Sequence, residues 1–188
     1  EHLASIANPP RPFSVSAIIP HWMNRFEHGW GSWICTMTKE TYGQVKQNVP
    51  VEYLGGLSNA MAIRHVAAYG YYDTEEEIAD VARKAMFTHK SEEALSGGEF
   101  FARVTYRVMH GEAPQDAIEN VAIRMSTFIQ GKVSQAILKY NEAIDKNSAL
   151  YQEKFADDLA ITSMARLWDV GRSEPIRVGK ASPTEGTL

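Results

Sequence analysis

Cysteine is almost absent from this chain of 188 residues, which contains only Cys35. A single cysteine excludes an internal disulfide and therefore the class of small domains held together by disulfides. It favours a reducing, intracellular compartment, and we expect the cytoplasm. No secretory signal is visible at the N-terminal end. Because Cys35 has no convincing histidine partner nearby in the sequence, a catalytic thiol is also disfavoured.

Long apolar runs and an excess of positive charge are absent as well. No stretch is long and apolar enough to predict a transmembrane helix. The net charge is −4, whereas nucleic-acid-binding proteins usually carry a basic surface. We therefore predict neither a membrane nor nucleic acid as a partner. Hydrophobic residues make up 44% and charged residues 22%, which is typical of a single globular domain with a real core.

Several motifs with defined chemistry are missing. There is no zinc-ligand spacing, no phosphate-binding P-loop and no nucleophile elbow. Asp157-Asp158 is an adjacent carboxylate pair, but neighbours on a helix diverge by about 100° and do not face one site. No stretch shows sustained strand alternation with hairpin turns. The lack of a strand pattern favours an all-α fold.

The first part of the chain is rich in proline, glycine and aromatic residues. Four prolines, Pro9, Pro10, Pro12 and Pro20, are expected to prevent a helix in residues 1–20. From His21 to Val45 we predict short helices and turns, with 41–47 in one of them. Residues 49–58 form a loop around Gly55-Gly56. Residues 1–57 are thus expected to be the irregular part of the domain.

Helix signals become strong from Ser58 onward. Ser58 is a candidate N-cap for a helix over 59–69, which Gly70 would end. Thr74 and Glu77 have the spacing of a capping box for the next helix. Ser91 is placed to cap a third helix that runs to about His110, and its apolar stripe is Ala94, Gly97, Gly98, Phe101, Val104, Thr105 and Val108.

The helical pattern continues into the last third of the chain. Pro114 stands where a first helical turn accepts proline. The apolar pattern then runs on to Gly131, which is expected to interrupt or kink it, and a last helix covers about 148–170. We predict one all-α domain of about six or seven helices, with a helical core over 58–170 and a polar tail over 171–188. Because neither end resembles a natural terminus, an internal piece of a longer protein is expected.

Two phrases combine loop and helix-start features. They are 57–64 (Leu-Ser-Asn-Ala-Met-Ala-Ile-Arg) and 88–94 (Thr-His-Lys-Ser-Glu-Glu-Ala), about 30 residues apart. Helix N-termini carry free amides and positive dipole ends that suit anions, so two of them could form one pocket for a phosphate-containing ligand. The candidate ligand-binding residues are Gly56, Ser58, Asn59, Arg64 and His89.

Each candidate also has an ordinary structural interpretation. The Gly-Gly-Leu-Ser run can be a turn before a capped helix, and Arg64 can form an interhelical ion pair. His89 can be a loop histidine with a packing role. The residues alone leave both interpretations open.

Together, the two phrases resemble the central part of the ADP-ribosylglycohydrolase family, which also includes some lens crystallins. That family shows a Gly-Asn-Gly loop, then two small residues, then Met-Arg, and Asn59 and Arg64 keep this spacing. Its Thr-His step before an Ala/Gly-rich helix resembles Thr88-His89 and the residues that follow. The similarity extends over about 30–121, roughly half of the chain.

The resemblance implies an all-α enzyme that hydrolyses the glycosidic bond of ADP-ribose conjugates with magnesium. ADP-ribose or an ADP-ribosylated substrate would be the ligand; Asn59 would line its pocket, Arg64 would brace the loop and His89 would contact it. The family's Thr-Asp-Asp and Asp-Thr-Asp metal-ligand phrases do not occur in these 188 residues, and Ser58 and Ala60 replace the loop glycines.

These departures leave two hypotheses. In the first, the chain is part of an active enzyme whose metal ligands lie outside it. In the second, the protein is a catalytically inactive family member with a structural or protein-interaction role. Its partner surface would then come from the aromatic residues near the start, Phe13, Trp22, Phe26, Trp30 and Trp33, although core packing explains them equally well.

Overall fold

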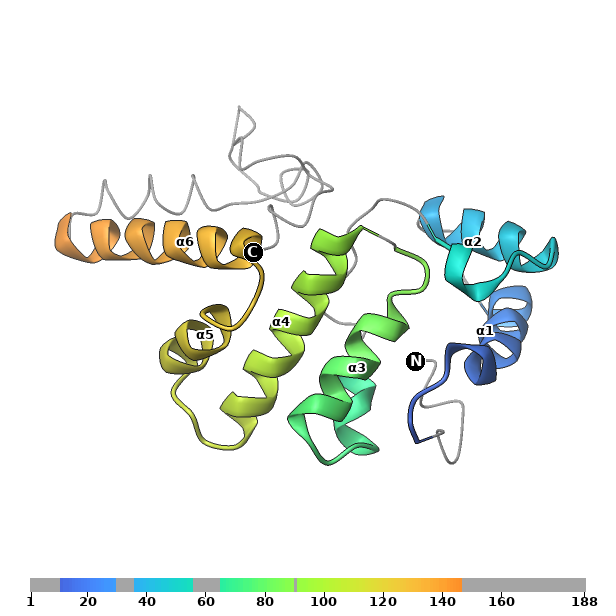
Figure 1. Cartoon of the computed structure of the whole chain (residues 1–188), viewed down its shortest axis with the longest axis horizontal. Helices are drawn as coiled ribbons and strands as arrows, with labels where there is room; N and C mark the ends of the chain where they lie inside the picture. Colours follow the sequence, from blue (N-terminus) through green and yellow to red (C-terminus); the bar gives the residue numbers. More distant parts are fainter. Residues whose placement is uncertain (1–10, 30–35, 56–64, 90, 147–188) are drawn as a thin grey trace.

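The computed structural model describes residues 11–29, 36–55, 65–89 and 91–146. Within these ranges the chain forms six α-helices and two 3-10 helices and no strand, so the all-α prediction is confirmed. The α-helices are α1 (Val15–Gly29), α2 (Thr36–Lys46), α3 (Glu75–Ala85), α4 (Glu92–Met109), α5 (Pro114–Ala122) and α6 (Thr127–Lys146). The 3-10 helices are η2 (Val51–Tyr53) and η3 (Val66–Gly70). Figure 1 shows α3 and α4 in the middle, with α1 and α2 on one side and α5 and α6 on the other.

The starts of α3 and α4 are capped as their sequences predict. The Thr74 hydroxyl accepts a hydrogen bond from the Glu77 amide at 3.2 Å, and the Glu77 carboxylate accepts one from the Thr74 amide at 3.2 Å. This is a complete capping box. The Ser91 hydroxyl accepts a hydrogen bond from the Ala94 amide at 3.1 Å. Both caps satisfy amides that have no partner within their own helix.

The end of α4 and the start of α5 also follow local signals. Gly111 has a φ of +95°, the left-handed conformation that glycine adopts without strain. The Gly111 amide donates to the Val108 carbonyl and the Glu112 amide donates to the Arg107 carbonyl, which is the hydrogen-bond pattern of a Schellman motif. Pro114 then occupies the first turn of α5.

The prediction that residues 1–20 contain no helix is wrong, because α1 begins at Val15 and continues through Pro20. Proline removes one backbone hydrogen bond from a helix. Here Pro20 is exposed, while Ile18 and Trp22 on the same helix are fully buried. The burial of these two large side chains offsets the lost hydrogen bond.

The predicted break at Gly131 is also wrong, because α6 runs unbroken from Thr127 to Lys146. The chain leaves the helix earlier, between the end of α5 at Ala122 and Thr127. There the Gln130 side-chain amide donates to the Met125 carbonyl at 2.9 Å and to the Ile123 carbonyl at 3.4 Å. The turn therefore exposes backbone carbonyls that a side chain of the next helix satisfies.

Other predicted elements are described in part or lie outside the described residues. Of the helix expected over 59–69, the structure describes only the end, where η3 is a 3-10 helix that finishes at Gly70. The helix over 41–47 belongs to the longer α2. The helix expected over 148–170 and the tail over 171–188 lie outside the described residues.

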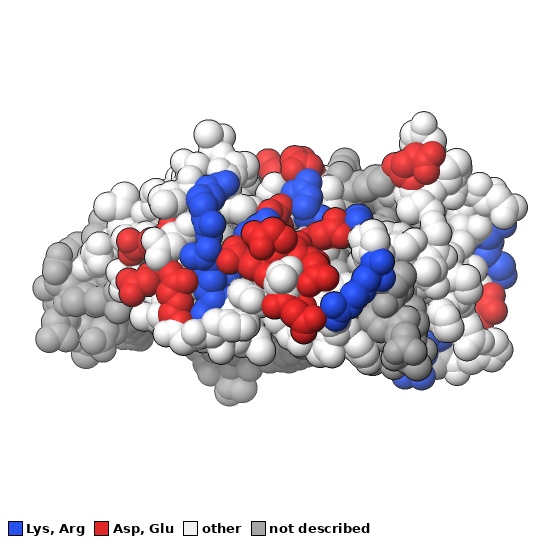
Figure 2. Space-filling model, turned by 60° about the horizontal axis from the view of Figure 1, so that its bottom comes forward, with Lys and Arg blue, Asp and Glu red and all other residues white. Residues whose placement is uncertain are grey.

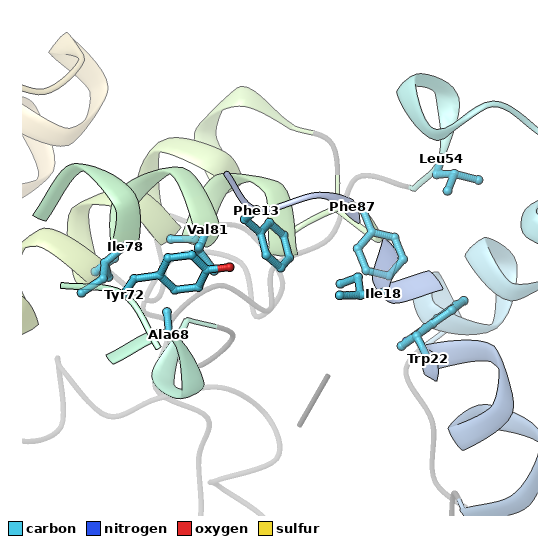
Figure 3. Close-up of a cluster of buried hydrophobic side chains, with 11 residues drawn as sticks. Phe13, Ile18, Trp22, Leu54, Ala68, Tyr72, Ile78, Val81 and Phe87 are labelled. Atoms are coloured by element: carbon cyan, nitrogen blue, oxygen red, sulfur yellow. The ribbon is translucent and has the colours of Figure 1, made fainter. Parts of the chain in front are cut away.

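Two apolar clusters form the core. The first joins α1, η3, α3 and the segment around Phe87, and Figure 3 shows it extending from Ile78 and Tyr72 to Ile18 and Trp22. The rings of Trp22 and Phe87 meet edge to face with their centroids 5.2 Å apart. The second cluster joins α4, α5 and α6, and its buried members are Phe100, Val121, Ala122, Ile129 and Val133.

Helix α4 contributes to both clusters, with Phe100 in one and Ala102 in the other. The single stripe predicted for this helix is therefore too narrow. Ala94, Gly97 and Gly98 are buried as predicted, but Phe100 and Ala102 outside the stripe are buried as well. A helix that packs against neighbours on two sides buries more than one face.

Ion pairs connect the polar sides of α3 and α4. Arg103 lies 3.1 Å from Glu75 on α3 and 2.9 Å from Glu99 on its own helix. Arg107 lies 3.0 Å from Glu75, and Arg83 lies 3.1 Å from Glu99. Figure 2 shows acidic side chains gathered in the middle of one face, with basic side chains beside them.

Candidate functional site

The candidate site is built around Gly55, which lies against the backbone of residues 87–89. A Cβ atom placed on Gly55 would lie 2.7 Å from the Phe87 carbonyl oxygen, 2.9 Å from the Thr88 carbonyl carbon and 3.1 Å from the His89 nitrogen. Gly55 also has a φ of +99°. Both the close approach and the backbone conformation require glycine here. The loop that precedes the first phrase therefore touches the backbone of the second.

Two neighbouring contacts hold Gly55 in this position. Its amide donates a hydrogen bond to the Gln44 side-chain oxygen on α2 at 2.8 Å. The preceding residue, Leu54, is fully buried in the first apolar cluster. Gly55 is thus held in place by α2, by the first apolar cluster and by the backbone of residues 87–89.

His89 is fully buried, with 0% of its surface exposed. Its Nδ1 atom lies 2.6 Å from the hydroxyl oxygen of Thr88, which is also buried. One of these two groups donates the hydrogen bond, and the choice depends on the tautomer of the ring. The His89 amide donates to the Met86 carbonyl at 2.7 Å, which closes the turn after α3. The sequence prediction of a histidine in the loop between two helices is correct, and the ring is packed rather than open to solvent.

A second buried histidine, His65, was not among the predicted site residues. It is 1% exposed, and its Nδ1 atom has no hydrogen-bond partner within the described part of the chain. Burial lowers the pKa of His65 to about 4, so the ring is neutral at physiological pH. The sequence contained one indication that His65 could be buried, because it directly precedes the short apolar run Val66-Ala67-Ala68.

Tyr69 connects His65 to α4. The His65 and Tyr69 rings meet edge to face with centroids 5.6 Å apart. The Tyr69 hydroxyl donates to the Ala102 carbonyl at 2.8 Å, and burial raises the pKa of Tyr69 to about 12. The aromatic ring and its hydrogen bond thus anchor η3 on α4.

Four of the five predicted site residues, Gly56, Ser58, Asn59 and Arg64, lie outside the described residues; only His89 is described. The structure brings Gly55, the residue directly before Gly56, to the His89 backbone. In the ranges that the structure describes, no group of three or more His, Cys, Asp or Glu side chains could hold a metal ion.

Comparisons with known proteins add no identification. No protein-family model matches the chain, and neither the curated proteins nor the solved structures gave a significant match. Among the described helices, none is both long and apolar enough to cross a membrane.

Proposed function

We propose that the protein is ADP-ribosylglycohydrolase-like and hydrolyses the glycosidic bond of ADP-ribose conjugates with magnesium. The observation that supports this proposal most is the close approach of Gly55 to the Phe87–His89 backbone. This contact places the loop before residues 57–64 against the Thr88-His89 step, and such proximity is what one shared ligand site requires. The helical architecture agrees with the fold that the resemblance implies.

The roles of individual residues belong to the same proposal. His89 would contact ADP-ribose, Asn59 would line the ribose and diphosphate pocket with Gly56 and Ser58, and Arg64 would brace the loop. Magnesium is an expectation from the resemblance alone. The described residues offer it no ligand cluster, so we assign it no ligands and derive no catalytic step from it. An intracellular, cytoplasmic location is proposed from the single cysteine.

Calorimetric titration of the full-length protein with ADP-ribose and magnesium tests this function. We expect binding, and we expect His89→Ala to weaken it by about fivefold or more, since a lost ligand hydrogen bond costs on the order of 1 kcal/mol. His28→Ala is the control, because His28 is an exposed histidine on α1 and should leave the affinity unchanged. Absence of heat at millimolar ADP-ribose would contradict the proposal.

The complete burial of His89 favours a second candidate, a catalytically inactive family member with a structural or protein-interaction role. A packed imidazole contributes to stability without touching a ligand. The two candidates differ in one measurement, the release of ADP-ribose from an ADP-ribosylated protein in the presence of magnesium. Turnover by the full-length protein supports the enzyme, and binding without turnover supports the inactive member.

A further inference from the structure

We propose that Gln44 is a positioning residue for the candidate site, a role that rests on the proposed function. Gln44 lies on α2, far in sequence from both phrases, and the sequence pattern does not single it out. Its side-chain oxygen accepts the hydrogen bond of the Gly55 amide at 2.8 Å. Because Gly55 packs against the backbone of residues 87–89, Gln44 determines how closely the two segments approach each other.

Gln44 holds both ends of the loop between α2 and Gly55. Its backbone carbonyl accepts hydrogen bonds from the Gln47 amide at 3.1 Å and from the Val49 amide at 3.0 Å. Its side chain accepts the bond from Gly55, eleven residues further along the chain. The start and the end of this loop are therefore tied to one residue.

The helix that carries Gln44 is itself anchored. Thr41, one turn earlier on α2, is fully buried, so this side of the helix packs against the rest of the molecule. Residues three positions apart lie on the same side of a helix, so Gln44 projects from the anchored side of α2. A fixed helix can hold Gly55 in one position.

The position of Gly55 matters because its neighbours on the other side are Thr88 and His89. The close packing leaves no room for Gly55 to shift toward them, and the Gln44 bond prevents a shift away from them. Loss of the bond leaves the Gly55 amide without its acceptor and loosens the loop. Ligand affinity then falls although no ligand-contacting residue has changed.

The test compares Gln44→Met, which keeps the size of the side chain but removes the acceptor, with Gln44→Glu, which keeps an acceptor oxygen at the same reach. Gln47→Ala is the matched control, since Gln47 is an exposed glutamine directly after the same helix. For each full-length variant we would measure ADP-ribose affinity with magnesium, the thermal midpoint, and hydrogen exchange of the Gly55 amide by NMR.

We expect Gln44→Met to speed exchange at Gly55 and to weaken ADP-ribose binding, each by about fivefold or more, as loss of one hydrogen bond implies. Gln44→Glu should retain most of the Gly55 protection and bind more tightly than Gln44→Met. Gln47→Ala should match the wild type in all three measurements.

The outcomes separate this inference from the proposed function. Wild-type affinity in Gln44→Met overturns the positioning role while leaving the proposed function intact. The positioning role is also overturned if Gln44→Met and Gln44→Glu lose the same affinity and the same thermal midpoint, because that pattern indicates general destabilisation. A wild-type protein that binds no ADP-ribose overturns the proposed function, and this inference with it.

Discussion

At the scale of single residues, Gly55 is subject to two separate constraints. Its positive φ disfavours any side chain, and its close approach to the 87–89 backbone leaves no space for one. Gly111 has a similar φ of +95° but open space around it, and Gly43 in α2 has open space and an ordinary helical backbone. The three glycines therefore allow the two constraints to be measured separately.

Alanine at these three positions should give three different results. Gly55→Ala should lower the free energy of unfolding by roughly 3 kcal/mol, because the backbone atoms it meets cannot move aside. Gly111→Ala should cost about 1 kcal/mol from the backbone conformation alone. Gly43→Ala should stabilise by about 0.5–1 kcal/mol, because alanine is the better helix former. Urea unfolding measures all three, and equal effects at Gly55 and Gly111 would disprove the close packing at Gly55.

His65 should make stability depend on pH. Its pKa is about 4 in the folded protein and 6.5 ordinarily, so between these values the unfolded chain binds a proton that the folded protein excludes. The free energy of unfolding should therefore fall as pH decreases from about 6.5 to 4, by roughly 3 kcal/mol from this group. His65→Leu should remove this part of the pH dependence in urea unfolding, whereas His28→Ala should leave it. Identical pH profiles for His65→Leu and the wild type would show that His65 is protonated without cost in the folded state.

At the scale of elements, the α3–α4 hairpin combines predictable helix ends with an ion-pair network that the pattern did not predict. The acidic run Glu75 to Glu77 lies in the first turn of α3, where negative charge interacts favourably with the helix dipole. The structure adds a second role, because Glu75 also pairs with Arg103 and Arg107 of α4. Pairing across 28 and 32 residues depends on how the two helices cross, which no local rule specifies.

Arg103 should contribute more to stability than an exposed ion pair does. Its side chain is 20% exposed, and those of its partners Glu75 and Glu99 are 13% and 18% exposed. Arg103→Ala removes one of two close cationic partners from each carboxylate, since Arg107 and Arg83 remain, and we expect the free energy of unfolding to fall by about 1 kcal/mol. Lys84→Ala removes the more exposed pair with Asp80 and should change stability by less than about 0.5 kcal/mol. Equal effects in thermal unfolding would show that the network is merely a surface feature.

At the scale of the whole molecule, α4 joins the two apolar clusters. Phe100 and Val121 belong to the cluster with α5 and α6, and Ala102 belongs to the cluster with α3 and α1. Figure 1 shows α4 between these parts. Because both clusters use the same helix, the position of α1 and α2 relative to α5 and α6 depends on packing along α4.

The two wrong helix predictions have the same cause. Pro20 and Gly131 are both helix breakers by their own backbone chemistry, and both lie inside helices here. Ile18 and Trp22 flank Pro20, and Ile129 and Val133 flank Gly131; all four are buried in the core. Burial of neighbouring side chains exceeds the local preference of one residue, and a single sequence does not show which side chains will be buried.

What the sequence determined by itself is the helical class and the ends of α3, α4 and α5. Thr74, Ser91 and Pro114 act within one helical turn, and Gly111 within one tight turn, so the neighbouring residues suffice to predict them. Tertiary structure alone decided that Gln44, Gly55 and His89 meet. These residues come from three segments separated by 11 and 34 positions along the chain, and only the packing of α2 and α3 around a common core brings the Gln44 side chain and the Gly55 and His89 backbones together.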